Sequence, residues 1–445
     1  MRDIVVLIFL VGCIIAALRV PWHGVLGLAV FSYMNPHAFA WGFVRSLPAF
    51  QILFLVVAVM AFMTKDRQEL PKDWRLPAFI LLWFYFFLTT TQAYFPAIAW
   101  SKFLVVSKIY LPFLFTLILI NTREKLFYLI IAIGASIGFL GFKGGFFAVM
   151  TGFAHRVYGP PGTQFEENNA FAIAVLIAIP LLLLWYKESE NKLIKYGVLG
   201  TVPFIFASSI SSWSRGALLT MGVLGLMLLW HSKRKWLILP LMIVGIAATI
   251  HYLPDEWFGR MHTLETYEQD ASAMGRIKTW LDGWHHTLQH PIFGAGFDGW
   301  IYVSNRDWHS SYVEMFSEHG FIAFAIWMSM IIGTLYSLTA LPRKVKEIVG
   351  MEWVANYCYS VRMALICYMV GTLFLGLSYW DLLYHLIFIA VLIKQFALQE
   401  LKEKQGNRDS LIDSSHAPPP AGRSFVKPLQ DKQPITQTKG HLRSF

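Results

Sequence analysis

The sequence predicts an all-α polytopic membrane protein with about twelve transmembrane helices. Of its 445 residues, 56% are hydrophobic and only 14% are charged, whereas soluble globular domains carry about 25% charged residues. Apolar runs of roughly 15 to 20 residues recur from Ile4 to Leu398, and such runs are long enough, or nearly so, to cross a hydrocarbon core about 30 Å thick as helices. An open β-sheet is excluded within that core, because its unpaired backbone groups would find no water there.

The first two apolar runs, residues 4–18 and 24–34, are short for membrane spans, and Arg19, Pro21 and Gly24 separate them. The chain would have about twelve spans if these runs form one crossing unit with a bent or interfacial piece, and one more if both cross. We predict the smaller number, with both chain ends in the cytoplasm. No small-residue cleavage site follows the first run, so we expect that it is retained and is not a cleaved signal peptide.

Basic residues gather in alternating short loops, which the positive-inside rule assigns to the cytoplasm. These groups are Lys65, Arg67, Lys72 and Arg75; Arg123 and Lys125; Lys187, Lys192 and Lys195; Lys233, Arg234 and Lys235; and Arg343, Lys344 and Lys346. The net charge of +10 therefore follows from membrane orientation, and we predict no nucleic-acid partner.

The alternation of loops predicts the organisation of the chain. Residues 1–252 form N-terminal transmembrane helices and include one substantial outward loop, 143–169. Residues 253–318 form a long outward loop that contains helices, and residues 319–398 form the C-terminal transmembrane helices. Residues 399–445 are polar and contain a proline triplet, so we predict a disordered cytoplasmic tail.

The sequence lacks the spacings of common metal and nucleotide motifs, including HExxH, paired CxxC and the GxxxxGK[ST] phosphate loop. Cys13, Cys358 and Cys367 lie in spans or in a cytoplasmic loop, so no disulfide framework is implied. We therefore expect no metal and no cofactor, and we do not expect an ATP-driven pump.

Arginines on the outward side indicate an anionic ligand. Arg215 lies in SSISSWSRGALL between two spans joined by a tight turn, while Arg156 and Arg276 lie in the two outward loops. A snorkelling interfacial side chain is the alternative for Arg215. The positive-inside bias disfavours an outer arginine, however, and a planar guanidinium suits phosphate oxygens, so we predict binding of a lipid pyrophosphate. For Arg260 and Arg306 we prefer a structural surface role, with Arg260 as a possible supporting residue.

The segment NRDWHSSYVEMFSEHG concentrates polar side chains just before an apolar run. Ser311 and Glu314 have the spacing of a capping box, so a helix is predicted to begin there, with His309 ahead of its positive end. That position favours a neutral imidazole able to accept a proton from a hydroxyl, although a packing role is the alternative. Glu314 and Glu318 could orient a group or solvate one helix face, and we prefer solvation.

Three stretches, WSRGALL, MGRIKTWLDGWHHTLQHPIFGAGFDGW and HSSYVEMFSEHGF, resemble the C-terminal half of the O-antigen ligase and O-antigen polymerase superfamily, over roughly residues 140–400. His309, Ser310 and Gly320 fit the ligase pattern of that superfamily, whereas Ala323 departs from its last position. The N-terminal region and the block RMHTLETYEQDASAMGR resemble a subgroup of probable O-glycosylation ligases associated with exosortase systems.

The resemblance implies a GT-C-type helical fold in the bacterial inner membrane, with a long periplasmic loop over the site. It implies a metal-independent, inverting glycosyltransferase that moves a glycan from undecaprenyl pyrophosphate to a hydroxyl. His309 matches the catalytic histidine of the family, and Arg215 and Arg276 match arginines expected to bind the diphosphate, with Arg156 a weaker match.

We expect an O-antigen ligase that acts in lipopolysaccharide biosynthesis and uses lipid A-core as acceptor. A protein O-glycosylation ligase, with a protein hydroxyl as acceptor, and an O-antigen polymerase using the same donor are the alternatives. A transporter of the lipid-linked glycan ranks last, because the spans carry few ionisable residues away from their ends.

Overall fold

The computed structural model describes residues 1–233, 235–262 and 271–416, which contain helices and no β-strand. The chain divides into two units, Met1–Leu398 and Gln399–Phe445, at the boundary predicted for the tail. The helices are α1 (Arg2–Arg19), α2 (Pro21–Tyr33), η1 (Pro36–Phe39), η2 (Phe43–Ser46), α3 (Ala49–Met63), α4 (Arg75–Thr91), α5 (Pro96–Leu119), α6 (Arg123–Met150), α7 (Asn168–Glu188), α8 (Lys192–Ile210), α9 (Arg215–His231), α10 (Lys235–Tyr252), α11 (Asp255–His262), α12 (Ala271–Gln289), α13 (Trp300–Val303), α14 (Ser311–Val345), α15 (Glu352–Gly371), η4 (Thr372–Phe374) and α16 (Asp381–His416).

Within the described ranges, seven helices are long and apolar enough to cross a membrane. They are α5, α6, α7, α8, α14, α15 and α16, and shorter apolar helices such as α3, α4 and α9 accompany them. The predicted class of polytopic helical membrane protein is therefore confirmed. The number of about twelve spans and the GT-C type stay predictions.

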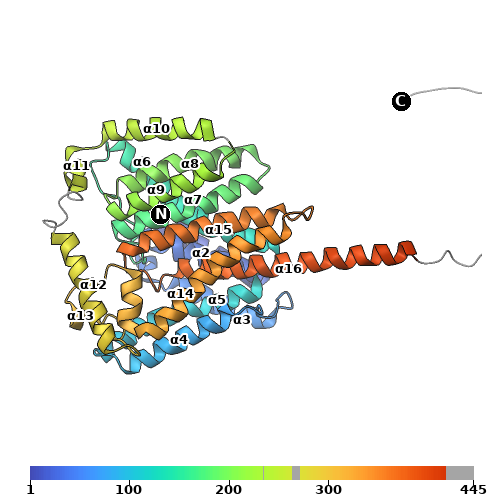
Figure 1. Cartoon of the computed structure of the whole chain (residues 1–445), viewed down its shortest axis with the longest axis horizontal. Coiled ribbons are helices and arrows are strands. Elements are labelled where there is room, and N and C mark those ends of the chain that lie inside the picture. The colour runs from blue at the N-terminus through green and yellow to red at the C-terminus, as the bar shows by residue number, and fades with distance from the viewer. Residues whose placement is uncertain (234, 263–270, 417–445) are drawn as a thin grey trace, which may run out of the picture. The chain divides into compact units, whose positions relative to one another are not determined.

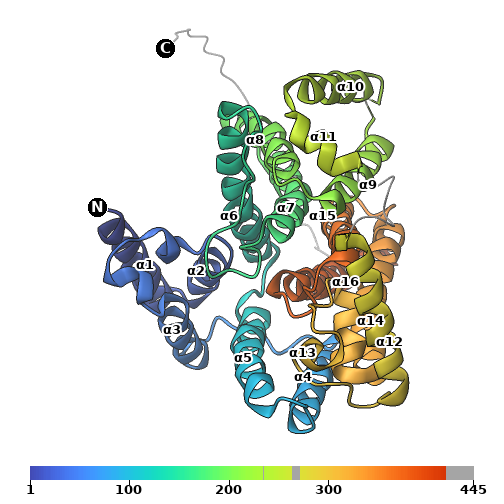
Figure 2. The same cartoon turned by 90° about the vertical axis from the view of Figure 1, so that its left-hand side faces the viewer.

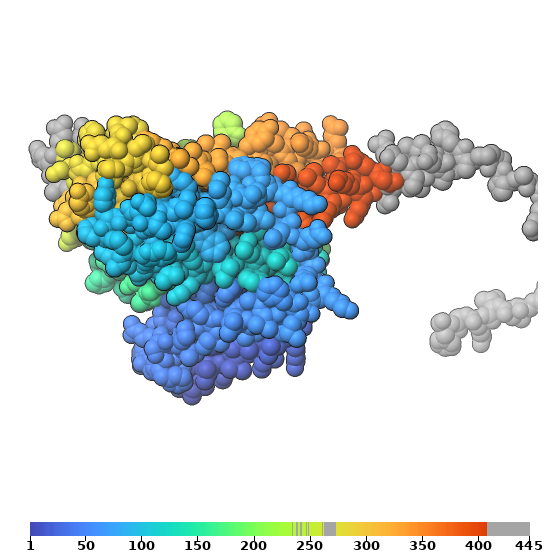
Figure 3. All heavy atoms as spheres, turned by 90° about the horizontal axis from the view of Figure 1, so that it is seen from below, coloured from blue at the N-terminus to red at the C-terminus, as the bar shows by residue number. Residues whose placement is uncertain are grey.

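Helices α1 and α2 form an antiparallel hairpin. Gly24 packs against Ala17, so that an added Cβ would lie 2.7 Å from the Cβ of Ala17. Farther along, the rings of Phe9 and Phe31 are 5.5 Å apart. The chain reverses at Pro21, which begins α2, so these helices lie side by side and do not form one bent helix. Figure 3 shows this N-terminal part, coloured blue, on one side of the first unit.

Helix α6 is longer than predicted, because glycines along it permit close packing. A Cβ on Gly145 would lie 1.7 Å from the carbonyl oxygen of Phe204 in α8, and one on Gly134 would lie 2.9 Å from the Cβ of Leu181 in α7. Small residues let membrane helices approach each other in this way. The helix therefore ends at Met150, and the predicted start of the outward loop at residue 143 stays a prediction.

The basic loops predicted to share one face do lie together. Lys125 pairs with Asp66 at 2.8 Å, and Arg123 pairs with Glu188 at 3.1 Å. These contacts join the start of α6 to the loop after α3 and to the end of α7. The grouping is confirmed for these three loops, while the assignment of this face to the cytoplasm stays a prediction from the positive-inside rule.

The connections predicted to face outward also meet. The amide of Val157, in the first predicted outward loop, donates to the carbonyl oxygen of Ser211 at 3.1 Å, beside the turn that carries Arg215. The amide of Tyr94, between α4 and α5, donates to the carbonyl oxygen of Ala295 in the second outward loop at 3.2 Å. Helices α11, α12 and α13 lie across this end of the long helices (Figures 1 and 2). The predicted outward segment 253–318 therefore contains helices, as expected.

A kink at Gly320 divides α14 into a short helix, residues 311–319, and a long apolar helix. Gly320 has a φ of 75°, and a Cβ there would lie 2.2 Å from the carbonyl oxygen of Ile292. The amide of Phe321 donates to the carbonyl oxygen of Pro291 at 2.8 Å. Only glycine fits this close approach without strain, so the kink marks where the apolar part of the helix begins.

Helix α16 continues to His416, so residues 399–416 are helical where a disordered tail was predicted. The sequence QELKEKQ at the start of this stretch consists of residues with good helix propensity. The rest of the predicted tail, residues 417–445, lies outside the described residues.

Candidate active site

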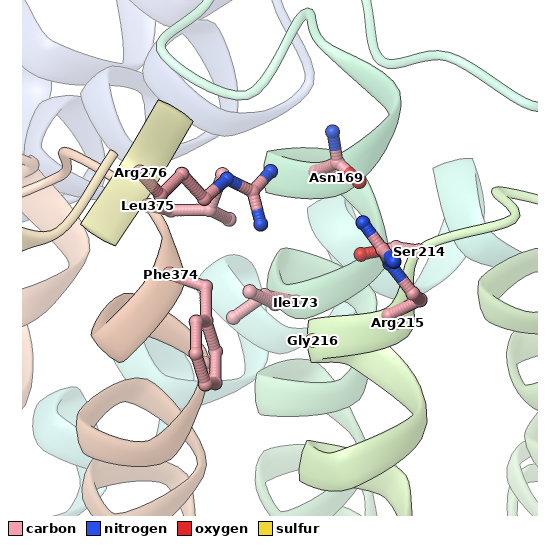
Figure 4. A pocket seen from close by; sticks show the side chains of 9 residues that line it. Asn169, Ile173, Ser214, Arg215, Gly216, Arg276, Phe374 and Leu375 are labelled. Carbon is pink, nitrogen blue, oxygen red and sulfur yellow. The ribbon is translucent and has the colours of Figure 1, made fainter. Parts of the chain in front are cut away.

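Arg215 and Arg276 line the same hollow. Figure 4 shows their side chains approaching it from different helices, with the amide of Asn169 beside them. The full lining consists of Asn169, Ile173, Ser214, Arg215, Gly216, Arg276, Gly371, Phe374 and Leu375. The structure therefore brings together two of the three arginines predicted to bind a diphosphate.

Arg215 is the first residue of α9, and the preceding turn fixes its position. The hydroxyl of Ser214 caps the helix by accepting a hydrogen bond from the amide of Ala217 at 3.3 Å. Trp213, one residue earlier, has a left-handed φ of 59°. The hollow thus receives both a guanidinium and the positive end of a 17-residue helix, which together favour an anion.

Arg156 lies beside this turn but does not line the hollow. Its guanidinium carbon is 5.1 Å from the ring centre of Trp213, and its side chain is exposed. The side-chain amide of Asn168 donates to the carbonyl oxygen of Ser212 at 2.7 Å and ties the end of the loop that carries Arg156 to the turn. A direct role for Arg156 stays a prediction, and Asn169 is a lining residue not predicted from the sequence.

Arg276 projects from α12, and Arg306 covers Gly275, the residue just before it. A Cβ on Gly275 would lie 1.9 Å from Nη1 of Arg306, whose side chain is otherwise exposed. This contact fits the surface role predicted for Arg306. Arg260 belongs to α11, but its side chain lies outside the described part of the structure.

His309 does not line the hollow, but its segment is fastened to the wall. The hydroxyl of Ser311 donates to the carbonyl oxygen of Leu375, a lining residue, at 2.9 Å. Two residues span at most about 7 Å, so the backbone of His309 lies within that distance of Ser311. His309 itself is half-buried and has a left-handed φ of 46°.

A second contact holds the backbone just before His309. The indole nitrogen of Trp280, one turn after Arg276 on α12, donates to the carbonyl oxygen of Trp308 at 2.8 Å. The amide of His309 donates to Oδ1 of Asp307 at 3.4 Å. Helix α12 therefore carries Arg276 and, through Trp280, also holds the backbone next to the predicted base.

The helix predicted to start near Ser311 does so, but without the capping box. Ser310 is the N-cap and makes no side-chain cap. Ser311 also accepts a hydrogen bond from the amide of Leu377 at 2.8 Å, and Glu314 accepts from the amide of Ser378 at 3.0 Å and from its hydroxyl. The two side chains thus bind the segment before α16, because that segment supplies unpaired backbone groups.

The solvation role predicted for Glu314 and Glu318 is wrong, since they are only 8% and 1% exposed. Glu318 accepts hydrogen bonds from the indole nitrogen of Trp308 at 2.9 Å and the hydroxyl of Tyr379 at 2.6 Å. Buried carboxylates need such donors. Both glutamates therefore help to position the segment that carries His309.

His319 was missed by sequence reasoning. It is buried, and its two ring nitrogens lie 2.6 Å from the hydroxyl of Thr89 and 2.8 Å from that of Tyr379. Its place beside Gly320, at the end of the HSSYVEMFSEHGF stretch, was the available signal. Its partners come from α4 and from the segment before α16, and no local pattern indicates them.

Comparison with protein families places these residues in a known group. Residues 204–328 match the model of the family described as O-Antigen ligase. This segment is similar to that family. The matched region contains Arg215, Arg276 and His309, whereas the lining residues Asn169 and Leu375 lie outside it.

This match supports a ligase- or polymerase-type function in glycan assembly. Residues 1–190 match a second family, DUF5935, whose function is unknown. No match was found among curated proteins.

Proposed function

We propose that the protein transfers a glycan from undecaprenyl pyrophosphate to a hydroxyl at the periplasmic face of the bacterial inner membrane. The preferred acceptor is lipid A-core, which makes the protein an O-antigen ligase of lipopolysaccharide biosynthesis. The ligase-family segment supports the reaction class.

The observation that carries the proposal is the shared hollow of Arg215 and Arg276. Two guanidinium groups can hold diphosphate oxygens through paired, charge-assisted hydrogen bonds. The charge on these oxygens grows as the sugar leaves, so the same groups stabilise the transition state more than the ground state. The amide of Asn169 adds a neutral donor beside them.

His309 is the proposed general base. The acceptor oxygen forms a bond to the anomeric carbon while the bond from that carbon to the phosphate oxygen breaks, which inverts the configuration. The imidazole takes the hydroxyl proton, and the electron pair of the broken bond leaves with undecaprenyl pyrophosphate. The fastening of Trp308 and Ser311 supports this role, because a base must be held in reach of its proton.

A protein O-glycosylation ligase or an O-antigen polymerase is the second candidate. Two observations favour keeping it: Ala323 departs from the ligase pattern, and the N-terminal match is to a family of unknown function. These candidates share the donor and differ in the acceptor.

The test is a reaction of purified protein with undecaprenyl pyrophosphate-linked glycan and one of three acceptors: lipid A-core, an acceptor protein, or more of the donor. His309→Ala is compared with the parent, and His285→Ala, an exposed histidine on α12, is the matched control. We expect product with lipid A-core from the parent and the control, and none from His309→Ala.

Each other outcome has a defined meaning. Normal turnover by His309→Ala would end the proposed role of that residue. Product with protein or donor alone would select the second candidate. If the donor binds but no glycan is transferred to any of the three acceptors, the result would argue against glycosyl transfer altogether.

A further inference from the structure

A basic cluster lies at the opposite end of the molecule from the hollow, around the ring of Tyr359 on α15. The imidazole of His231 stacks on this ring with centres 3.5 Å apart. Nζ of Lys187 is 5.3 Å and the guanidinium carbon of Arg362 is 5.8 Å from the ring centre. We call these four residues the Tyr359 cluster. They come from α7, α9 and α15, which lie side by side (Figure 2).

The positive charge of the Tyr359 cluster is not balanced by carboxylates. Across the described ranges, neither Lys187 nor Arg362 has a carboxylate oxygen within 4 Å. Glu188 is the nearest acidic neighbour in the chain, but it binds Arg123 at 3.1 Å and Asn356 at 2.9 Å. A tyrosine ring offsets only part of the mutual repulsion of two cations, so the cluster favours an anion.

The depth of the cluster matches that of phospholipid headgroups. Trp230 precedes His231 and is 84% exposed, and Trp236 follows Lys235 and is 92% exposed. Exposed tryptophans of this kind mark the membrane interface. The cluster also lies on the face to which the positive-inside rule assigns the cytoplasm, where anionic lipids attract basic groups.

An apolar path leads from the cluster into the membrane. Leu219, Leu226 and Trp230 are exposed and share one side of α9, since they are spaced by seven and four positions. An acyl chain can lie along this stripe while its phosphate reaches the cations.

We propose that the Tyr359 cluster binds the phosphate of an anionic phospholipid in the cytoplasmic leaflet, with Lys187 and Arg362 as its main donors. Arg362 also contacts the hydroxyl of Thr339 on α14 at 3.5 Å. The bound lipid therefore bridges α7, α9 and α15, and it fastens α9, whose other end carries Arg215. This inference does not depend on the proposed glycosyl transfer.

The test is native mass spectrometry of the full chain with phosphatidylglycerol, with phosphatidylcholine as the zwitterionic comparison. The variant Lys187→Gln/Arg362→Gln removes two cations from the cluster. The matched control, Lys65→Gln/Lys72→Gln, removes two exposed cations elsewhere on the same face. We expect the dissociation constant for phosphatidylglycerol to rise about tenfold in the cluster variant and less than about twofold in the control.

Three results would overturn the proposal. They are equal binding by the cluster variant and the parent, equal binding of phosphatidylcholine and phosphatidylglycerol, and displacement of the lipid by millimolar inorganic phosphate, which would assign the site to a soluble anion. If the double variant does not fold, Lys187→Gln decides the matter, because its side chain is exposed. We expect it to weaken binding about threefold, and no change would reject the site.

Discussion

The indole nitrogen of Trp308 donates a 2.9 Å hydrogen bond to the buried carboxylate of Glu318. This bond joins the residue before His309 to the short helix that follows it. It belongs to a set of contacts that hold a left-handed backbone in place, and a strained conformation persists only where its surroundings impose it. The position of the proposed base is therefore set by Trp308 and Glu318, which do not line the hollow.

Trp308→Phe should lower kcat about tenfold and leave the donor KM nearly unchanged. The variant keeps an aromatic ring but removes a buried hydrogen bond to Glu318, and leaving that acceptor unsatisfied costs about 1–3 kcal/mol. Steady-state kinetics over a range of donor concentrations measures the split. Trp284→Phe, an exposed tryptophan on α12, is the control. A raised KM with normal kcat would place Trp308 in donor binding instead.

Arg215→Lys and Arg276→Lys should each lower kcat/KM for the donor by at least about tenfold, because an ammonium group cannot bind two phosphate oxygens as a guanidinium does. Arg306→Lys, which changes an arginine beside the hollow but outside its lining, should keep near-normal activity. Full activity in both site variants would show that the arginines are structural.

Gly145→Ala should lower the free energy of unfolding in detergent by about 1–3 kcal/mol, the usual range for overpacking. The new Cβ would lie 1.7 Å from the carbonyl oxygen of Phe204, so α6 and α8 must separate. Gly200→Ala, which meets nothing within 4 Å in α8, is the control and should be neutral or stabilising. Equal stability of the two variants would contradict the close contact.

Asp73→Asn should destabilise the protein more than Asp66→Asn. Asp73 is buried and binds Arg75 and Lys394, both at 2.8 Å, so its loss leaves the buried guanidinium of Arg75 without its ionic partner, at a cost of about 3–5 kcal/mol. Asp66 is largely exposed, and its pair with Lys125 is worth about 0–1 kcal/mol. Chemical unfolding of both variants gives the comparison, and similar losses would refute the difference.

The same ion pairs predict a direction for pH dependence. Burial on its own would raise the pKa of Asp73, but hydrogen bonds from Arg75 and Lys394 outweigh it and lower that pKa well below its usual range. A depressed folded-state pKa means that the stabilisation is present above the unfolded pKa of about 3.9 and is lost as the pH falls below it. When the pH is lowered from about 6 to about 3, the midpoint of unfolding should therefore fall less in Asp73→Asn than in the parent.

The membrane class, the grouping of the basic loops and the candidate residues Arg215, Arg276 and His309 could be predicted from the sequence. Hydrophobic runs and alternating charge are local properties, since each span must satisfy its own backbone and each loop must face one side. Short stretches around the three residues were sufficient to predict an anion site and a base, and these roles stay predictions.

The end of α6, the burial of Glu314 and Glu318, and the convergence of Arg215 and Arg276 on one hollow came only from the three-dimensional arrangement. In the sequence, a glycine inside a helix looks like a glycine that ends one until the neighbouring helix is known. Gly145 continues α6 because it packs against the backbone of Phe204 in α8. Glu318 looks like a solvated residue until Tyr379, from another part of the chain, donates to it. Burial and hydrogen-bond partners arise between segments far apart in the chain, and no local pattern encodes them.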